Sequence, residues 1–234
     1  MKAILVPGFW LDGSSWSDIT PALEAAGHEV QAVTLPGMGD DRDRAAEVTL
    51  DDQVAAVVEL VDAAAADGTP VALVGHSGGG TVIGVVTDRR PELVARAVYV
   101  DSGPLGEGGC INDDLPVVDG VIPLPDWGFF DDEELTGLDE AALARFRDHA
   151  IPTPAHVAND AVHLGDERRW NVPSVVIAST MSSDLLTQLM GQGHPYVQEI
   201  AKTRDVRFID VPTGHWPQFS RPADLAAALV DALG

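Results

Sequence analysis

The chain alternates short apolar runs with longer segments of helical periodicity, and this alternation limits the possible folds more than any other feature. The runs near residues 4, 72 and 175 are almost continuously apolar. Such runs are typical of parallel strands covered by helices on both faces. The pattern therefore predicts an α/β fold with a mostly parallel central sheet. The candidate strands are Ala3–Pro7, Glu29–Leu35, Val71–Gly75, Ala97–Asp101, Ser174–Ser179 and Val206–Val211.

Apolar residues at helical spacing predict the helices that cover this sheet. One stripe begins at Trp16, a second spans Val54–Val61, and a third spans Leu225–Leu233 at the C-terminus. Thr49 stands three residues before Asp52, which fits a capping box at the start of the second helix.

The stretch from Pro104 to Trp170 interrupts the alternation. It is rich in Pro, Gly and acidic residues and holds a helical segment around Ala141–Arg147. A connection of this length is unusual within a compact domain unless it forms a lid or a binding loop. We expect residues 104–170 to be a lid inserted into a core domain made of residues 1–103 and 171–234.

Length and composition fit a single core. The chain has 234 residues, of which 45% are hydrophobic, so it can bury a substantial core. Asp and Glu outnumber Lys and Arg by 37 to 14, which gives a formal charge of -23. This charge repels phosphate backbones and anionic lipid surfaces, so we expect no nucleic-acid partner and no membrane partner.

Cysteine and histidine usage indicates neither a disulfide nor a metal site. Cys110 is the only cysteine, which excludes an intrachain disulfide and suits a reducing compartment. His149, His156 and His163 recur every seven residues, but Pro152 interrupts the helix that would align the first two. The apolar run at the N-terminus is too short for a signal peptide. We therefore expect a cytoplasmic protein without metal or other cofactor.

The segment Gly75–Gly79 matches the pattern G-x-S-x-G around Ser77. A buried strand, Val71–Val74, precedes it, and Thr81–Val86 can begin a helix behind it. This strand–turn–helix setting is the one in which a serine nucleophile is presented at the carboxyl edge of a sheet. Flanking glycines are needed because the chain is packed tightly at such a turn. Ser77 is therefore the candidate nucleophile.

A serine nucleophile needs a general base, and His215 is the candidate. It lies in the predicted loop between the last strand and the last helix. Two residues can supply the acid that orients it: Asp101, at the end of the strand beside the nucleophile strand, and Asp184, after the penultimate strand. We favour Asp101 because an acid on a rigid element orients the base better. With either acid the order along the chain is serine, acid, histidine, the order typical of a serine nucleophile in this strand–turn–helix setting. Asp101 also fits the closure of a turn, and Asp184 also fits a helix cap.

Several segments along nearly the whole chain together resemble those of one superfamily. They are Pro7–Trp10, Trp16, Gly75–Gly79, Gly214–Pro217 and Arg221-Pro222. The chain resembles the α/β hydrolases, specifically the branch of small lidded esterases and hydroxynitrile lyases. The resemblance implies the α/β-hydrolase fold and an oxyanion hole formed by the backbone N–H groups of Phe9 and Gly78. Many relatives begin the first segment with His-Gly, whereas Pro7-Gly8 stands here.

These residues favour a serine hydrolase that cleaves an ester or lactone of a small apolar molecule through an acyl-enzyme on Ser77. Two alternatives remain open: a carbon–carbon lyase that uses the same base, and a non-catalytic ligand-binding protein on a hydrolase scaffold. We expect a small-molecule substrate, and either a monomer or a homodimer. The aromatic residues proposed to bind it are Trp10, Trp127, Phe130 and Trp216, although lid aromatics also serve to pack a lid onto its core.

Overall fold

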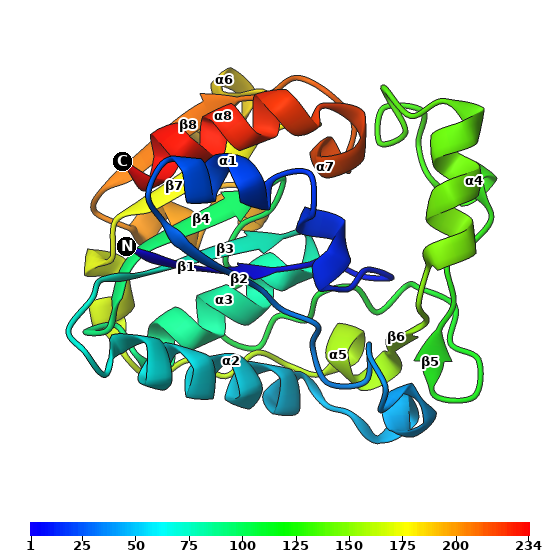
Figure 1. The fold of residues 1–234 in the computed structure, drawn as a ribbon, viewed down its shortest axis with the longest axis horizontal. Helices are drawn as coiled ribbons and strands as arrows, with labels where there is room; N and C mark the ends of the chain where they lie inside the picture. Colours follow the sequence, from blue (N-terminus) through cyan, green and yellow to red (C-terminus); the bar gives the residue numbers. More distant parts are fainter.

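The computed structural model describes residues 1–234 and contains a six-stranded sheet in which every pairing is parallel (Figure 1). The strand order is β2-β1-β3-β4-β7-β8. The predicted fold class and all six predicted strands are confirmed, with small shifts at the strand ends. The strands are β1 (Lys2–Val6), β2 (Glu29–Ala32), β3 (Val71–His76), β4 (Val94–Val100), β7 (Ser174–Ala178) and β8 (Val206–Asp210).

Helices cover both faces of this sheet. Figure 1 shows α1 (Thr20–Ala25) and α8 (Pro222–Leu233) on one face, and α2 (Leu50–Ala65) and α3 (Gly78–Arg89) on the other. Two further helices, α6 (Ser183–Gly191) and α7 (Pro217–Ser220), follow β7 and β8.

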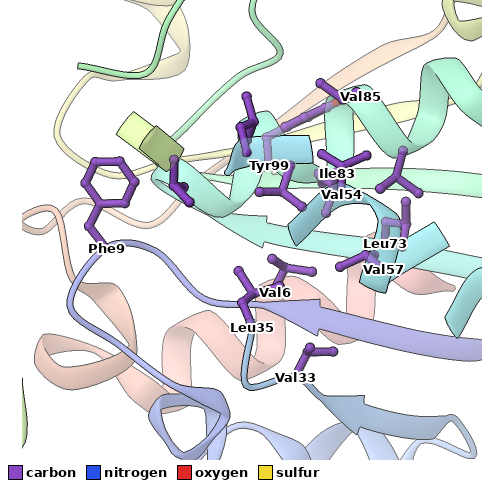
Figure 2. Packing of buried hydrophobic residues seen from close by; sticks show 14 of the residues in the cluster. Val6, Phe9, Val33, Leu35, Val54, Val57, Leu73, Ile83, Val85 and Tyr99 are labelled. Atoms are coloured by element: carbon purple, nitrogen blue, oxygen red, sulfur yellow. The ribbon is translucent and has the colours of Figure 1, made fainter. Parts of the chain in front are cut away.

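Alternate side chains of the strands enter two separate cores. In β1, Ile4 and Val6 pack on the side of α2 and α3, whereas Ala3 and Leu5 pack on the side of α1 and α8. Figure 2 shows the first core, in which Val6 and other strand residues lie among side chains of both helices. Because both faces are apolar, the strands read as the continuous apolar runs found in the sequence.

The start of α2 confirms the predicted capping box. Thr49 Oγ1 accepts a hydrogen bond from the Asp52 N–H at 3.1 Å, and Asp52 Oδ2 accepts one from the Thr49 N–H at 2.9 Å. The stripe that begins at Trp16 does not form one helix. It divides into a 3-10 turn, Gly13–Trp16, and α1, which begins at Thr20 because Pro21 fits only the first turn of a helix.

Residues 104–170 contribute no strand to the six-stranded sheet. This segment contains a small antiparallel pair, β5 with β6, and the helix α4, which stands apart from the sheet in Figure 1. Its division from the core as a lid stays a prediction. The regular elements of the segment are β5 (Val121–Ile122), a 3-10 turn at Trp127–Phe129, α4 (Glu140–His149), β6 (Thr153–Pro154), α5 (Ala155–Asn159) and a 3-10 turn at Glu167–Asn171.

The order of the strands creates a crevice at their carboxyl ends. After β1 the chain crosses to β2 at one edge, and after α2 it returns to β3 on the other side of β1. Ligands of open α/β sheets bind at such a reversal point. No helix has the length and apolar character needed to cross a bilayer; the cytoplasmic location stays a prediction.

Candidate active site

Ser77 occupies a strained turn between β3 and α3. Its backbone angles are φ 52° and ψ −125°, which a non-glycine residue rarely adopts. The turn requires glycine on both sides of it, since a Cβ at Gly75 would lie 2.5 Å from the Gly79 carbonyl oxygen, and a Cβ at Gly79 would collide with the Pro7 carbonyl. The Ser77 hydroxyl therefore stands at the carboxyl edge of the sheet on a rigid support.

An unbroken chain of hydrogen bonds connects Ser77, His215 and Asp101. His215 Nε2 lies 2.8 Å from Ser77 Oγ, and His215 Nδ1 lies 2.6 Å from Asp101 Oδ2. Asp101 directly follows β4, as predicted, and its side chain is only 6% exposed. Asp184 lies exposed in the first turn of α6 and makes no hydrogen bond to His215. Of the two candidate acids, the structure brings only Asp101 to the histidine.

Asp101 is held as a carboxylate by the donors around it. Burial raises the pKa of its carboxyl group, but the hydrogen bond and the charge of His215, together with hydrogen bonds from Thr180, outweigh this effect and leave the pKa below its ordinary value. Thr180 donates from its backbone N–H and from its hydroxyl, both to Asp101 Oδ1 at 2.9 Å. These contacts fix the carboxylate that faces His215.

His76, which sequence reasoning did not single out, supports the main chain of His215. Its Nε2 lies 2.7 Å from the His215 carbonyl oxygen. A carbonyl only accepts, so His76 carries its proton on Nε2 and its Nδ1 accepts from the Gln218 amide at 3.2 Å. Burial and the neighbouring His215 lower the pKa of His76 to about 3, so the ring is neutral. The only signal in the sequence that could have indicated His76 is its place inside the G-x-S-x-G segment.

Residues of the 104–170 segment hold the loop of His215 from the other side. The His215 N–H donates to the Glu134 carbonyl at 2.8 Å, and the Gly214 N–H donates to the Thr136 carbonyl at 3.0 Å. The two chains are so close that a Cβ at Gly214 would collide with the Glu134 carbonyl. The position of the histidine therefore depends on a segment 80 residues away, from 134 to 214.

Two backbone N–H groups beside Ser77 are free to donate. The Phe9 N–H makes no hydrogen bond within the protein. Gly78 is the first residue of α3, so its N–H has no acceptor in its own helix. Phe9 follows β1 and Gly78 follows β3, which are neighbouring strands. Both groups are thus available to an oxyanion at the reversal point of the sheet.

A cavity of about 390 Å³ lies above Ser77. Of the aromatic residues proposed to bind substrate, Trp10 and Phe130 line it, whereas Trp127 and Trp216 do not. Trp216 is 1% exposed and packs against Phe130, at 5.3 Å between ring centroids. Trp127 packs against both of these rings, at 5.8 Å from Phe130 and 6.4 Å from Trp216 between centroids. Trp127 and Trp216 therefore pack the 104–170 segment onto the sheet domain.

The fold and this site together define a class: an α/β protein whose serine lies on a sharp strand-to-helix turn and is hydrogen-bonded to a histidine and an aspartate. The comparison with protein families agrees. The family model described as the alpha/beta hydrolase family matches residues 3–228, and the chain belongs to this family.

Known proteins with similar sequences include enzymes named as esterases. The chain is 29% identical to a carbendazim hydrolyzing esterase of Nocardioides, over 99% of this chain and 98% of that one. It is 39% identical to salicylic acid-binding protein 2 of Nicotiana tabacum over 98 residues, which span 42% of this chain and 37% of the tobacco protein. An extracellular alpha/beta-hydrolase from a Paenibacillus species has a similar structure, with a TM-score of 0.79, 22% identity and coverage of 99% and 98%.

Proposed function

We propose that the protein is a carboxylic-ester hydrolase in which Ser77 is the nucleophile, His215 the general base and Asp101 the acid that orients it. The observation that carries the proposal is the hydrogen-bond chain from Asp101 Oδ2 through both ring nitrogens of His215 to Ser77 Oγ. With Nδ1–H donating to the carboxylate, Nε2 is left as the acceptor for the serine proton.

The reaction would proceed through two acyl-transfer steps. His215 Nε2 removes the proton from Ser77 Oγ as this oxygen attacks the ester carbonyl, and the N–H groups of Phe9 and Gly78 hold the oxyanion. The imidazolium then returns the proton to the departing alcohol, which leaves an acyl-Ser77 ester. Water, deprotonated by His215, attacks this ester and releases the carboxylic acid and the free serine.

Size and similarity support a small substrate. A cavity of about 390 Å³ is at the lower end of the range for small-molecule sites. The Nocardioides relative is named for hydrolysis of carbendazim and the tobacco relative for binding salicylic acid. An ester or lactone of that size is therefore the substrate class that we propose. A cyanide leaving group, as in a lyase, would need a cationic partner, and no Lys or Arg lines the cavity.

Covalent labelling and turnover test the proposal together. A fluorophosphonate should label Ser77, and the wild type should hydrolyse short p-nitrophenyl esters with an acyl-Ser77 adduct detectable by mass spectrometry. Replacing the nucleophile, Ser77→Ala, should lower kcat by about 10⁴-fold or more and abolish labelling. A carbon–carbon lyase would act without an acyl adduct. A non-catalytic ligand-binding protein with this fold would neither react with the probe nor hydrolyse any ester.

A further inference from the structure

The cavity above Ser77 contains a carboxylate that no basic side chain neutralises. Its two carboxylate side chains are Asp101, which is paired with His215, and Glu134. Glu134 forms no ion pair, and its Oε2 accepts a single hydrogen bond, from the Asp131 N–H at 3.0 Å. None of the residues that line the cavity is Lys or Arg. Glu134 therefore brings an uncompensated negative charge to the wall of the cavity.

Aromatic rings form much of the remaining wall. Phe129 and Phe130 precede Glu134 on the same segment, and the rings of these two phenylalanines pack edge to face at 5.5 Å. Trp10 packs edge to face with Phe130 at 5.7 Å, and Tyr196 lines the cavity from the α6–β8 connection. The faces of aromatic rings attract cations, and an aromatic wall with one carboxylate is the chemistry that recognises a substituted ammonium group.

We propose that this cavity selects esters that carry a positively charged, substituted ammonium group, and that Glu134 is the specificity-determining residue. The proposal rests on the proposed function for the reaction. It refines the expected apolar substrate to an ester whose apolar groups surround a cationic nitrogen. The formal charge of -23 adds a long-range attraction for such substrates. The same charges repel the carboxylate product when its acyl part is uncharged, which favours product release.

A pair of esters of equal shape tests the preference. Butyrylcholine and 3,3-dimethylbutyl butyrate differ in that a quaternary nitrogen in the first is a carbon in the second. We expect kcat/KM of the wild type to be about tenfold higher for the choline ester. In Glu134→Gln, which keeps an acceptor for the Asp131 N–H, this ratio should fall about fivefold.

Glu133→Gln is the matched control. Glu133 belongs to the same turn and carries the same charge, but it is exposed and does not line the cavity, so its loss should leave the ratio of the two esters unchanged. A ratio at or below one in the wild type overturns the proposal. An equal change in both variants also overturns it, because the preference would then follow net charge rather than the cavity.

Binding to a protein that cannot turn over separates this proposal from the reaction. Phenyltrimethylammonium, titrated calorimetrically into Ser77→Ala, should bind about fivefold more weakly when Glu134→Gln is added, and as tightly when Glu133→Gln is added. Absence of this binding, or equal binding by all three variants, contradicts the cation site. If neither ester is hydrolysed and Ser77 is not labelled, the esterase proposal fails, and the binding result still decides the preference of the cavity.

Discussion

Among single residues, the carboxylate that is hydrogen-bonded to His215 shows that the role open to a side chain depends on where the fold places it. Asp101 has a positive φ of 43°, follows β4 directly and is held by donors from the end of β7. Asp184 also follows a strand of the sheet, β7, but it lies further along the chain in the exposed first turn of α6. Two aspartates of identical chemistry therefore differ in their contacts: Asp101 is hydrogen-bonded to His215, and Asp184 is exposed.

The substitution Asp101→Asn should lower kcat by about 10⁴-fold, because an amide that donates toward His215 stabilises the wrong tautomer. Asp184→Asn should leave kcat within about twofold, as expected for an exposed side chain far from a special contact. Steady-state kinetics with a p-nitrophenyl ester measure both. A large loss in Asp184→Asn with little change in Asp101→Asn would reverse the assignment of the acid.

Sequence reasoning reached Ser77 and His215 because each lies in a local pattern that has a physical cause. Ser77 is enclosed by glycines that the tight turn requires, and His215 follows the last strand. The choice between Asp101 and Asp184 stayed open because it depends on which strand end faces the histidine. Glu134 was not predicted at all, since nothing local marks a residue that lines the cavity and whose carbonyl accepts a hydrogen bond from the histidine loop.

Among the elements, α4 is attached to the rest of the protein mainly by aromatic rings. Phe146 on α4 packs against Trp216 at 5.2 Å and against Phe219 at 5.3 Å between ring centroids. Trp127 adds a third ring at 5.5 Å. Because α4 stands apart from the sheet in Figure 1, these rings replace the broad apolar interface that the sheet-covering helices possess.

Removing the central ring, Phe146→Ala, should lower the free energy of unfolding by about 3 kcal/mol, the usual cost of a large cavity. It should also speed cleavage of residues 131–149 in limited proteolysis, because α4 has few other buried contacts. Urea unfolding and mass spectrometry measure the two effects. Arg145→Ala, at an exposed residue of α4, is the control and should change stability by less than about 0.5 kcal/mol. Similar losses in both variants would show that α4 is not held by its rings.

The elements were predictable to different degrees. The strands were readable because burial on both faces leaves a continuous apolar run. The helix after β1 was not, since its apolar spacing continues across a break that Pro21 imposes. The pair β5 and β6 has two residues in each strand, which is too short to produce an alternating pattern.

Across the whole molecule, a buried ion-pair network ties the end of the 104–170 segment to the sheet domain. Arg169 contacts Asp88 of α3 at 3.1 Å and Glu199 at 2.9 Å, and Lys202 also pairs with Glu199. Burial raises the pKa of Glu199, but hydrogen bonds from Lys202, Trp170 and Arg169 outweigh it and bring the pKa below its ordinary value of 4.5. The folded chain thus binds this proton less tightly than the unfolded chain.

The variant Glu199→Gln should be about 3 kcal/mol less stable than the wild type at pH 7, because it leaves Arg169 buried with one partner fewer. Since the pKa of Glu199 is lowered by folding, its contribution is complete above about pH 4.5 and is lost as the pH falls through the folded-state value. The stability difference measured by urea unfolding should therefore be constant from pH 7 to 5 and narrow below pH 4.5. A difference that does not change with pH would contradict this account.

The hydrogen bonds that the Glu134 and Thr136 carbonyls accept from the His215 loop also limit how the wall of the cavity can move. Movement of residues 134–136 would withdraw these carbonyls and displace the imidazole, so this part of the wall has to keep its place while His215 acts. Phe129 and Tyr196 line the cavity and are 52% and 53% exposed, so they lie where the cavity meets solvent. An arriving molecule therefore meets exposed rings beside a wall that cannot shift without displacing His215.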